Sequence, residues 1–70
     1  MREIAIRGEV IRLGQLLQLA GLADSGGEAR ELLALGGVTV NGEPESRRGR
    51  QLRAGDVVAA GGEQLRIVTA

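Results

Sequence analysis

The pattern of apolar and polar residues predicts a strand and then a helix at the start of the chain. Over residues 3–7 polar and apolar side chains alternate, with Ile4 and Ile6 on one face, which is typical of a short strand. Over residues 12–19 leucines recur at three- and four-residue spacing, the periodicity of a helix with one buried face. Gly21 follows as a stop for this first helix.

A capping pattern predicts a second helix. Ser25 precedes Glu28 by three residues, the arrangement in which each side chain accepts a hydrogen bond from the other's backbone amide. An apolar stripe follows at helical spacing, made of Ala29, Leu32 and Leu33. Gly36 can adopt the left-handed conformation that ends a helix, so the second helix should end near Leu35.

After the second helix the period drops to two, which predicts several short strands. Residues 38–40 and 43–45 flank Asn41-Gly42, a pair suited to a hairpin turn with positive backbone dihedrals. Pro44 cannot donate a ladder hydrogen bond, so it should lie at a sheet edge or a strand end. Residues 46–51 form a polar, arginine-rich loop.

The last third of the chain continues in the same way. Leu52 opens another segment, Gly55-Asp56 makes a turn in which the Asp56 side chain bonds nearby backbone amides, and Val57-Val58 forms a strand. Gly61-Gly62 turns again before a final strand over residues 64–68. We therefore predict an α+β fold, with two packed helices followed by a small, mainly antiparallel sheet of short strands.

The composition limits the core and the available chemistry. Seventy residues form at most one domain, so we expect a single domain over residues 1–70. The large apolar side chains are 10 Leu, 6 Val and 4 Ile, with no Phe, Tyr or Trp, so the core must be aliphatic. Without Cys or His the chain has neither disulfides nor the usual zinc ligands, and we expect no metal and no cofactor.

The residue types also argue against an enzyme. Catalysis commonly draws on His, Cys, Lys or Tyr, all of which are missing, or on carboxylate pairs, whereas the nine acids here are scattered. Ser25 and Ser46 have no His to activate them. The chain has no apolar segment long enough for a signal peptide or a membrane span, so we expect a cytoplasmic protein without membrane contact.

The charge distribution is more informative than its sum. The net charge is zero, yet all nine basic residues are Arg, and four of them fall within seven residues that contain no acid: Arg47, Arg48, Arg50 and Arg53. Arginine offers a planar fork that binds phosphate in a bidentate way and can stack on bases. The alternative is a solvated loop that keeps the protein soluble, and the Arg preference can also reflect genome composition.

An ordered combination of motifs over about residues 11–59 resembles the S-four-type RNA-binding domain, named after ribosomal small-subunit protein four. The matching positions are Arg12-Leu13, Leu16-Leu17, Ser25, Glu28-Ala29-Arg30, Leu33, Gly36, Val38-Thr39-Val40-Asn41-Gly42 and Gly55-Asp56-Val57-Val58. Residues 25–30 and 47–50 are most similar to the short stand-alone bacterial members, the YbcJ-like group. The resemblance implies an alpha-L motif, in which the helix pair and the following hairpin grip structured RNA.

The resemblance implies RNA-binding roles for nine residues, namely Arg12, Ser25, Gly26, Gly27, Arg30, Arg47, Arg48, Arg50 and Arg53. Many family members carry a basic residue directly after the capping serine, where this chain has Gly26 and Gly27. Two glycines at a helix N-terminus let a phosphate approach bare backbone amides, or they merely relieve crowding at a tight turn. For Arg12 the alternative is a plain helix-surface role. The expected partner is structured RNA, ribosomal or transfer RNA being candidates, and the expected state is a monomer with no small-molecule substrate.

Two other classes share parts of this pattern. Ubiquitin-like sulfur carriers also contain a Val-x-Val-Asn-Gly-Glu hairpin and a late Gly-Asp-x-Val turn. They need a flexible C-terminal Gly-Gly, whereas this chain ends at Ala70 and its Gly61-Gly62 lies inside a predicted hairpin. Their hairpin-first order also differs from a chain with paired helices before the Val-Thr-Val strand. A protein-interaction module whose arginines meet an acidic partner remains open at this point.

Overall fold

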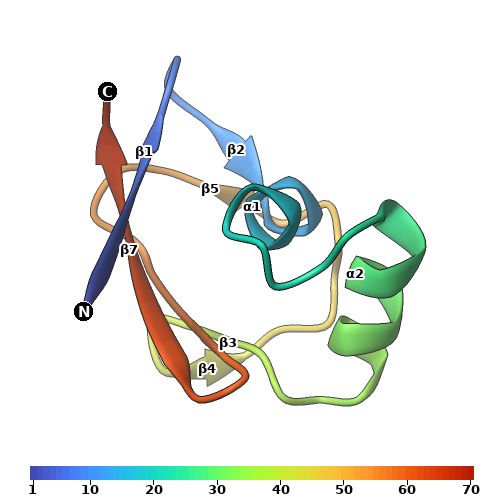
Figure 1. The fold of residues 1–70 in the computed structure, drawn as a ribbon. Helices are drawn as coiled ribbons and strands as arrows, with labels where there is room; N and C mark the ends of the chain where they lie inside the picture. The colour runs from blue at the N-terminus through green and yellow to red at the C-terminus, as the bar shows by residue number, and fades with distance from the viewer.

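The computed structural model describes residues 1–70, and it has two helices and seven short strands (Figure 1). The elements in chain order are β1 (Arg2–Ile6), β2 (Ile11–Arg12), α1 (Leu13–Leu19), α2 (Gly26–Ala34), β3 (Thr39–Val40), β4 (Glu43–Pro44), β5 (Gln51–Leu52), β6 (Val57–Ala60) and β7 (Glu63–Thr69). The α+β class predicted from the sequence is confirmed. Neither helix has the length and apolar character needed to cross a bilayer.

The main sheet has five strands in the order β1-β7-β6-β3-β4, and it is not purely antiparallel. The first and last strands pair in parallel, with Ile4 opposite Ile67, while the other three pairs are antiparallel. A parallel pair needs a long connection between its strands, and here almost the whole domain supplies it. The expectation of a mainly antiparallel sheet is therefore confirmed, and the parallel pairing of β1 with β7 is an addition that the sequence did not predict.

The core is a single aliphatic layer between the main sheet and the helices. It contains sixteen buried residues, all of them apolar, with no buried polar side chain. They are Ile4, Ile6, Leu13, Leu16, Leu17, Ala20, Ala23, Ala29, Leu33, Val38, Val40, Leu52, Val58, Ala60, Leu65 and Ile67. Both helices, the sheet and the short strand β5 contribute to this one core, so all of them are held in fixed relative positions.

The second helix begins as its sequence indicates, with one difference in its cap. The Ser25 hydroxyl oxygen accepts a hydrogen bond from the Glu28 amide at 3.1 Å, as predicted. The Glu28 carboxylate, however, accepts from the Asp24 amide at 3.1 Å and not from that of Ser25. The reciprocal bond has moved back by one residue, which ties the preceding turn to the helix. At the other end Gly36 has a φ of 79°, as expected.

The turns also follow the sequence closely. Asn41 and Gly42 have φ values of 52° and 84°, and they join β3 to β4. Pro44 lies in β4, which is an edge strand of the main sheet. Gly61 and Gly62, with φ values of 59° and 81°, form the turn between β6 and β7. This glycine pair is built into the sheet and does not form the flexible tail of a sulfur carrier.

Candidate nucleic-acid interface

A two-stranded ribbon that the sequence did not predict carries part of the candidate site. In this antiparallel ribbon of β2 and β5, Ile11 lies opposite Leu52 and Arg12 lies opposite Gln51. Leu52 is fully buried and Ile11 packs against the core, so this pair forms the inner face. Because side chains alternate along a strand, Arg12 and Gln51 lie on the outer face, and Arg53 continues that face one residue beyond β5.

The arginine-rich loop, predicted over residues 46–51, is the connection between β4 and β5, residues 45–50, and it lies across the start of α1. The Leu13 amide donates to the Arg50 carbonyl at 2.8 Å, and the Gly14 amide donates to the Arg48 carbonyl at 2.9 Å. These bonds satisfy two of the amides that a helix start leaves without partners. A Cβ at position 14 would collide with the Arg48 side chain, so glycine lets the loop approach this closely. The loop backbone is therefore fixed to the helix and not freely solvated.

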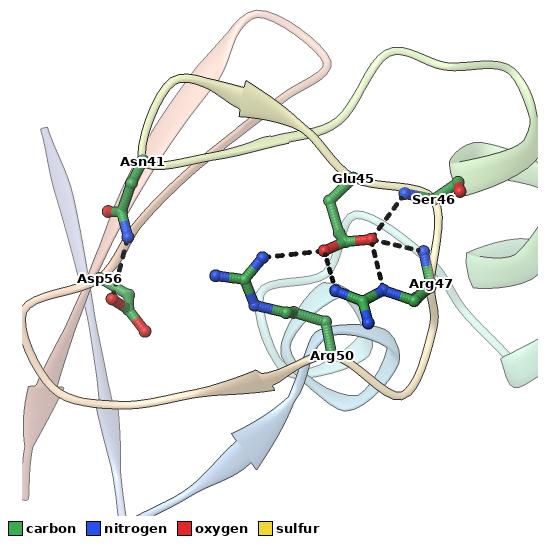
Figure 2. A network of polar contacts seen from close by, with 6 residues as sticks. All are labelled: Asn41, Glu45, Ser46, Arg47, Arg50 and Asp56. Atoms are coloured by element: carbon green, nitrogen blue, oxygen red, sulfur yellow. Dashed lines mark hydrogen bonds and ion pairs between the residues drawn. The ribbon is translucent and has the colours of Figure 1, made fainter.

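One carboxylate holds the loop from the other side. Figure 2 shows the guanidinium groups of Arg47 and Arg50 converging on Glu45, whose side chain is only 9% exposed. Arg47 is bidentate, with Nε to Oε2 and Nη2 to Oε1 both at 3.1 Å, and Arg50 Nη1 donates to Oε1 at 2.8 Å. The backbone amides of Ser46 and Arg47 donate to Oε2 at 3.1 and 3.0 Å.

The electrostatics follow from this geometry. The hydrogen bonds from the Arg47 and Arg50 side chains, with that from the Arg47 amide, hold the pKa of Glu45 well below its usual range. The hydrogen bond to Glu45 and the negative charge of its carboxylate raise the pKa of Arg47. The group therefore stays ionised as a unit, and two of the four clustered arginines have part of their charge neutralised within the loop.

A second polar link fixes the turn that follows Arg53. The Asn41 side chain donates to the Asp56 carboxylate at 3.0 Å (Figure 2) and accepts from the Val57 amide at 2.9 Å. Asp56 in turn accepts from the Arg53 amide at 2.8 Å, the local turn bond expected from the sequence. Partial burial acts to raise the pKa of Asp56, but these hydrogen bonds and the charges of Arg50 and Arg53 outweigh it and lower the pKa.

The start of α2 contributes the remaining candidate residues. Gly26 and Gly27 are the first two residues of the helix, and Arg30 lies one turn further on its exposed surface. A Cβ on Gly26 would come no closer than 3.9 Å to any neighbouring atom, and one on Gly27 no closer than 3.8 Å. Crowding therefore does not require glycine at either position.

Six of the nine candidate residues are arginines, and they fall into two groups; the other three, Ser25, Gly26 and Gly27, lie at the start of α2. Four arginines, called here the free arginines, make no ion pair: Arg12, Arg30, Arg48 and Arg53. The other two, Arg47 and Arg50, are called the Glu45-bound arginines. The larger surface hollow, of about 500 Å³, is lined mainly by apolar residues and contains none of the nine. The candidate site is therefore an open surface, and sequence reasoning missed Glu45 as its central acid.

Comparison with known protein families identifies the family of this chain. A family model described as the S4 domain matches residues 4–68 of the chain. The chain belongs to the S4 domain family. The resemblance noted over residues 11–59 of the sequence is thereby confirmed, and the match extends beyond it into the first and last strands of this S4 domain, to the second half of β1 and nearly all of β7.

Individual relatives agree with this assignment. The probable ribosome maturation protein RlbA of Bacillus subtilis (strain 168) is 53% identical over 55 residues, which are 79% of this chain and 78% of that protein. The crystal structure of the 30S ribosomal protein S4e from Thermoplasma acidophilum is similar with a TM-score of 0.64 and 25% identity over 84% of this chain. This S4 domain spans only 31% of the S4e chain.

Proposed function

We propose that this S4 domain is a non-catalytic module that binds structured RNA through its arginine surface. The observation that carries the proposal is the placement of the free arginines on backbone fixed by hydrogen bonds, in a chain of the S4 family. Arg48 lies in the loop held to α1, and Arg53 precedes the turn held by Asp56. A charge on fixed backbone loses less conformational freedom on binding than one on a mobile loop.

The chemistry of the surface favours recognition of shape over base sequence. Proteins that hold single strands stack bases on aromatic rings, and this chain has none. Guanidinium groups and the amides of Gly26 and Gly27 at the start of α2 are suited to phosphate oxygens. Phosphate contacts fix position and orientation on a folded RNA, while base edges stay largely unread. The surface would then act as the alpha-L motif that the family resemblance implies.

The relatives narrow the choice of RNA. One is named as a probable ribosome maturation protein and another is a protein of the 30S ribosomal subunit. We therefore propose ribosomal RNA, in a role connected with ribosome maturation, as the partner of this chain. If the partner were instead an acidic protein, the arginine surface would need no match to the spacing of phosphates. A comparison of folded with unstructured RNA separates these two kinds of partner.

A competition between two RNAs tests the proposed function. At fixed, near-physiological salt, a stable hairpin and a length-matched unstructured RNA compete for the labelled protein. We expect the hairpin to bind about tenfold more tightly, because only a folded RNA presents phosphates at fixed spacing. Both competitors carry the same charge, so the ratio of their affinities measures shape alone. Tighter binding of the unstructured strand would contradict shape recognition, and absence of binding to both would contradict RNA binding itself.

The two glycines at the start of α2 give a second prediction. Gly26→Ala with Gly27→Ala should raise stability by up to about 1 kcal/mol, because alanine favours the helix and both positions have room for a Cβ. The added methyl groups should also keep phosphate from the amides and weaken hairpin binding by about three- to tenfold. Melting curves and RNA titrations measure the two effects. Gly37→Ala, which also has room for a Cβ but lies outside the helix, is the control. Unchanged affinity of the double variant would remove these amides from the site.

A further inference from the structure

The carboxylate of Glu45 accepts more hydrogen bonds than any other side chain of the protein, yet Glu45 belongs to none of the motifs that mark the family resemblance. Its two carboxylate oxygens accept five hydrogen bonds, three from guanidinium groups and two from backbone amides. Its own amide donates to the Val38 carbonyl at 3.0 Å, so its backbone is also fixed, next to β3. An acid in the middle of a proposed RNA surface needs a physical account.

The acid has two opposite effects on an anionic partner. It neutralises part of the charge of Arg47 and Arg50, which by itself would weaken the attraction of phosphate. It also orders the loop, since without it the amides of Ser46 and Arg47 lose their acceptor and two long side chains regain their rotamer freedom. Screening by salt reduces the first effect, most of all at the exposed Arg47 side chain, whereas the ordering effect persists.

We infer that Glu45 is a positioning residue of the RNA surface, and that it strengthens RNA binding although it is negatively charged. The inference rests on the proposed function. Glu45 holds one side of the loop while the carbonyls of Arg48 and Arg50 hold the other side to α1. Arg47 uses Nε and Nη2 for the carboxylate, its side chain stays 72% exposed, and its Nη1 edge is available to a phosphate.

The direction in which one substitution changes RNA affinity tests the inference. Glu45→Gln keeps the shape, raises the net charge by one and replaces an acceptor oxygen with an amide that cannot accept. Charge alone predicts tighter binding of a hairpin RNA, whereas a positioning role predicts binding about tenfold weaker, because Arg47 is no longer held where it meets a phosphate and that contact is lost. Glu43→Gln is the matched control, since Glu43 is exposed, makes no ion pair and lies two residues away in β4. The control should bind as tightly as the parent or slightly more tightly.

Two further measurements separate positioning from a loss of stability. Hydrogen exchange of the Leu13 and Gly14 amides should be faster in Glu45→Gln and unchanged in Glu43→Gln, because these amides donate to loop carbonyls. The slope of log affinity against log salt should become less steep by about one in Glu45→Gln, as one phosphate contact is lost. A variant that only destabilised the fold would bind through its folded fraction with an unchanged slope.

The outcomes are distinct. Binding by Glu45→Gln that equals or exceeds that of Glu43→Gln would overturn the inference and leave the proposed function standing. A parent protein that binds no hairpin would overturn the proposed function, and the exchange of the two amides would still show whether Glu45 holds the loop. If Glu45→Gln does not fold, Glu45→Asp replaces it, because aspartate keeps the charge but is one methylene shorter. Weaker binding by Glu45→Asp supports positioning, and unchanged binding overturns it.

Discussion

Replacing Arg48 and Arg53 together by Gln is expected to weaken hairpin RNA binding about a hundredfold at near-physiological salt. Both are free arginines on fixed backbone, so each can give a phosphate a charge-assisted hydrogen bond worth about 1.5–3 kcal/mol. Loss of two phosphate contacts should also make the slope of log affinity against log salt less steep by about two. Titrations at several salt concentrations measure both quantities.

The control removes the same charge from elsewhere on the surface. Arg7 and Arg66 are exposed and make no ion pair, and they lie outside the family motifs. Arg7→Gln with Arg66→Gln should therefore weaken binding only severalfold and leave the salt slope unchanged. Equal losses from the two double variants would show that net charge alone determines affinity. The exposed positions of all four residues make a large change in stability unexpected for either variant.

Local signals in the sequence predicted most of the regular elements. The cap at Ser25, the stop at Gly36 and the turn at Asn41-Gly42 each depend on residues within a few positions of one another, and all three are confirmed. Apolar periodicity likewise predicted both helices within one or two residues of their observed ends. These features need no knowledge of the rest of the fold, which is why one sequence suffices for them.

Features that depend on distant residues were not predicted. The strand β2 has only two residues, too few for any periodicity, and it exists because Ile11 and Arg12 pair with β5 about forty residues later. The parallel pairing of β1 with β7 joins opposite ends of the chain. Neither pairing leaves a mark in the local pattern, although the buried positions of β1 and β7 are already apolar in the sequence.

The candidate site shows the same division. Four of its arginines were found from their clustering and two, Arg12 and Arg30, from the family resemblance. The acid-free window of seven residues began two residues after Glu45 and so excluded the partner of Arg47 and Arg50. The structure brings that acid onto Arg47 and Arg50 and leaves the other two clustered arginines, Arg48 and Arg53, without an ion pair. Sequence alone could not separate bound from free arginines, because the separation depends on how the loop folds back over α1.

Leu52→Ala is expected to have the largest effect on stability and to disturb the arginine surface as well. Leu52 is completely buried, lies in β5 and carries the inner face of the ribbon whose outer face includes Arg12 and Gln51. Truncating a buried leucine costs about 2–5 kcal/mol. A chain of this length has a stability of about 4–10 kcal/mol, and each kcal/mol changes Tm by about 4–8 °C. Thermal melting should therefore show a Tm lower by at least about 10 °C.

Leu35→Ala is the matched control, because it removes the same atoms from a side chain that is 83% exposed at the end of α2. Its free energy of unfolding should change by less than about 0.5 kcal/mol. Below its melting transition, Leu52→Ala should also bind hairpin RNA more weakly than Leu35→Ala, since Arg53 follows the truncated residue directly. A Tm of Leu52→Ala close to that of Leu35→Ala would show that the ribbon does not share the core, and the fixed placement of Arg12 and Arg53 would then lose its physical basis.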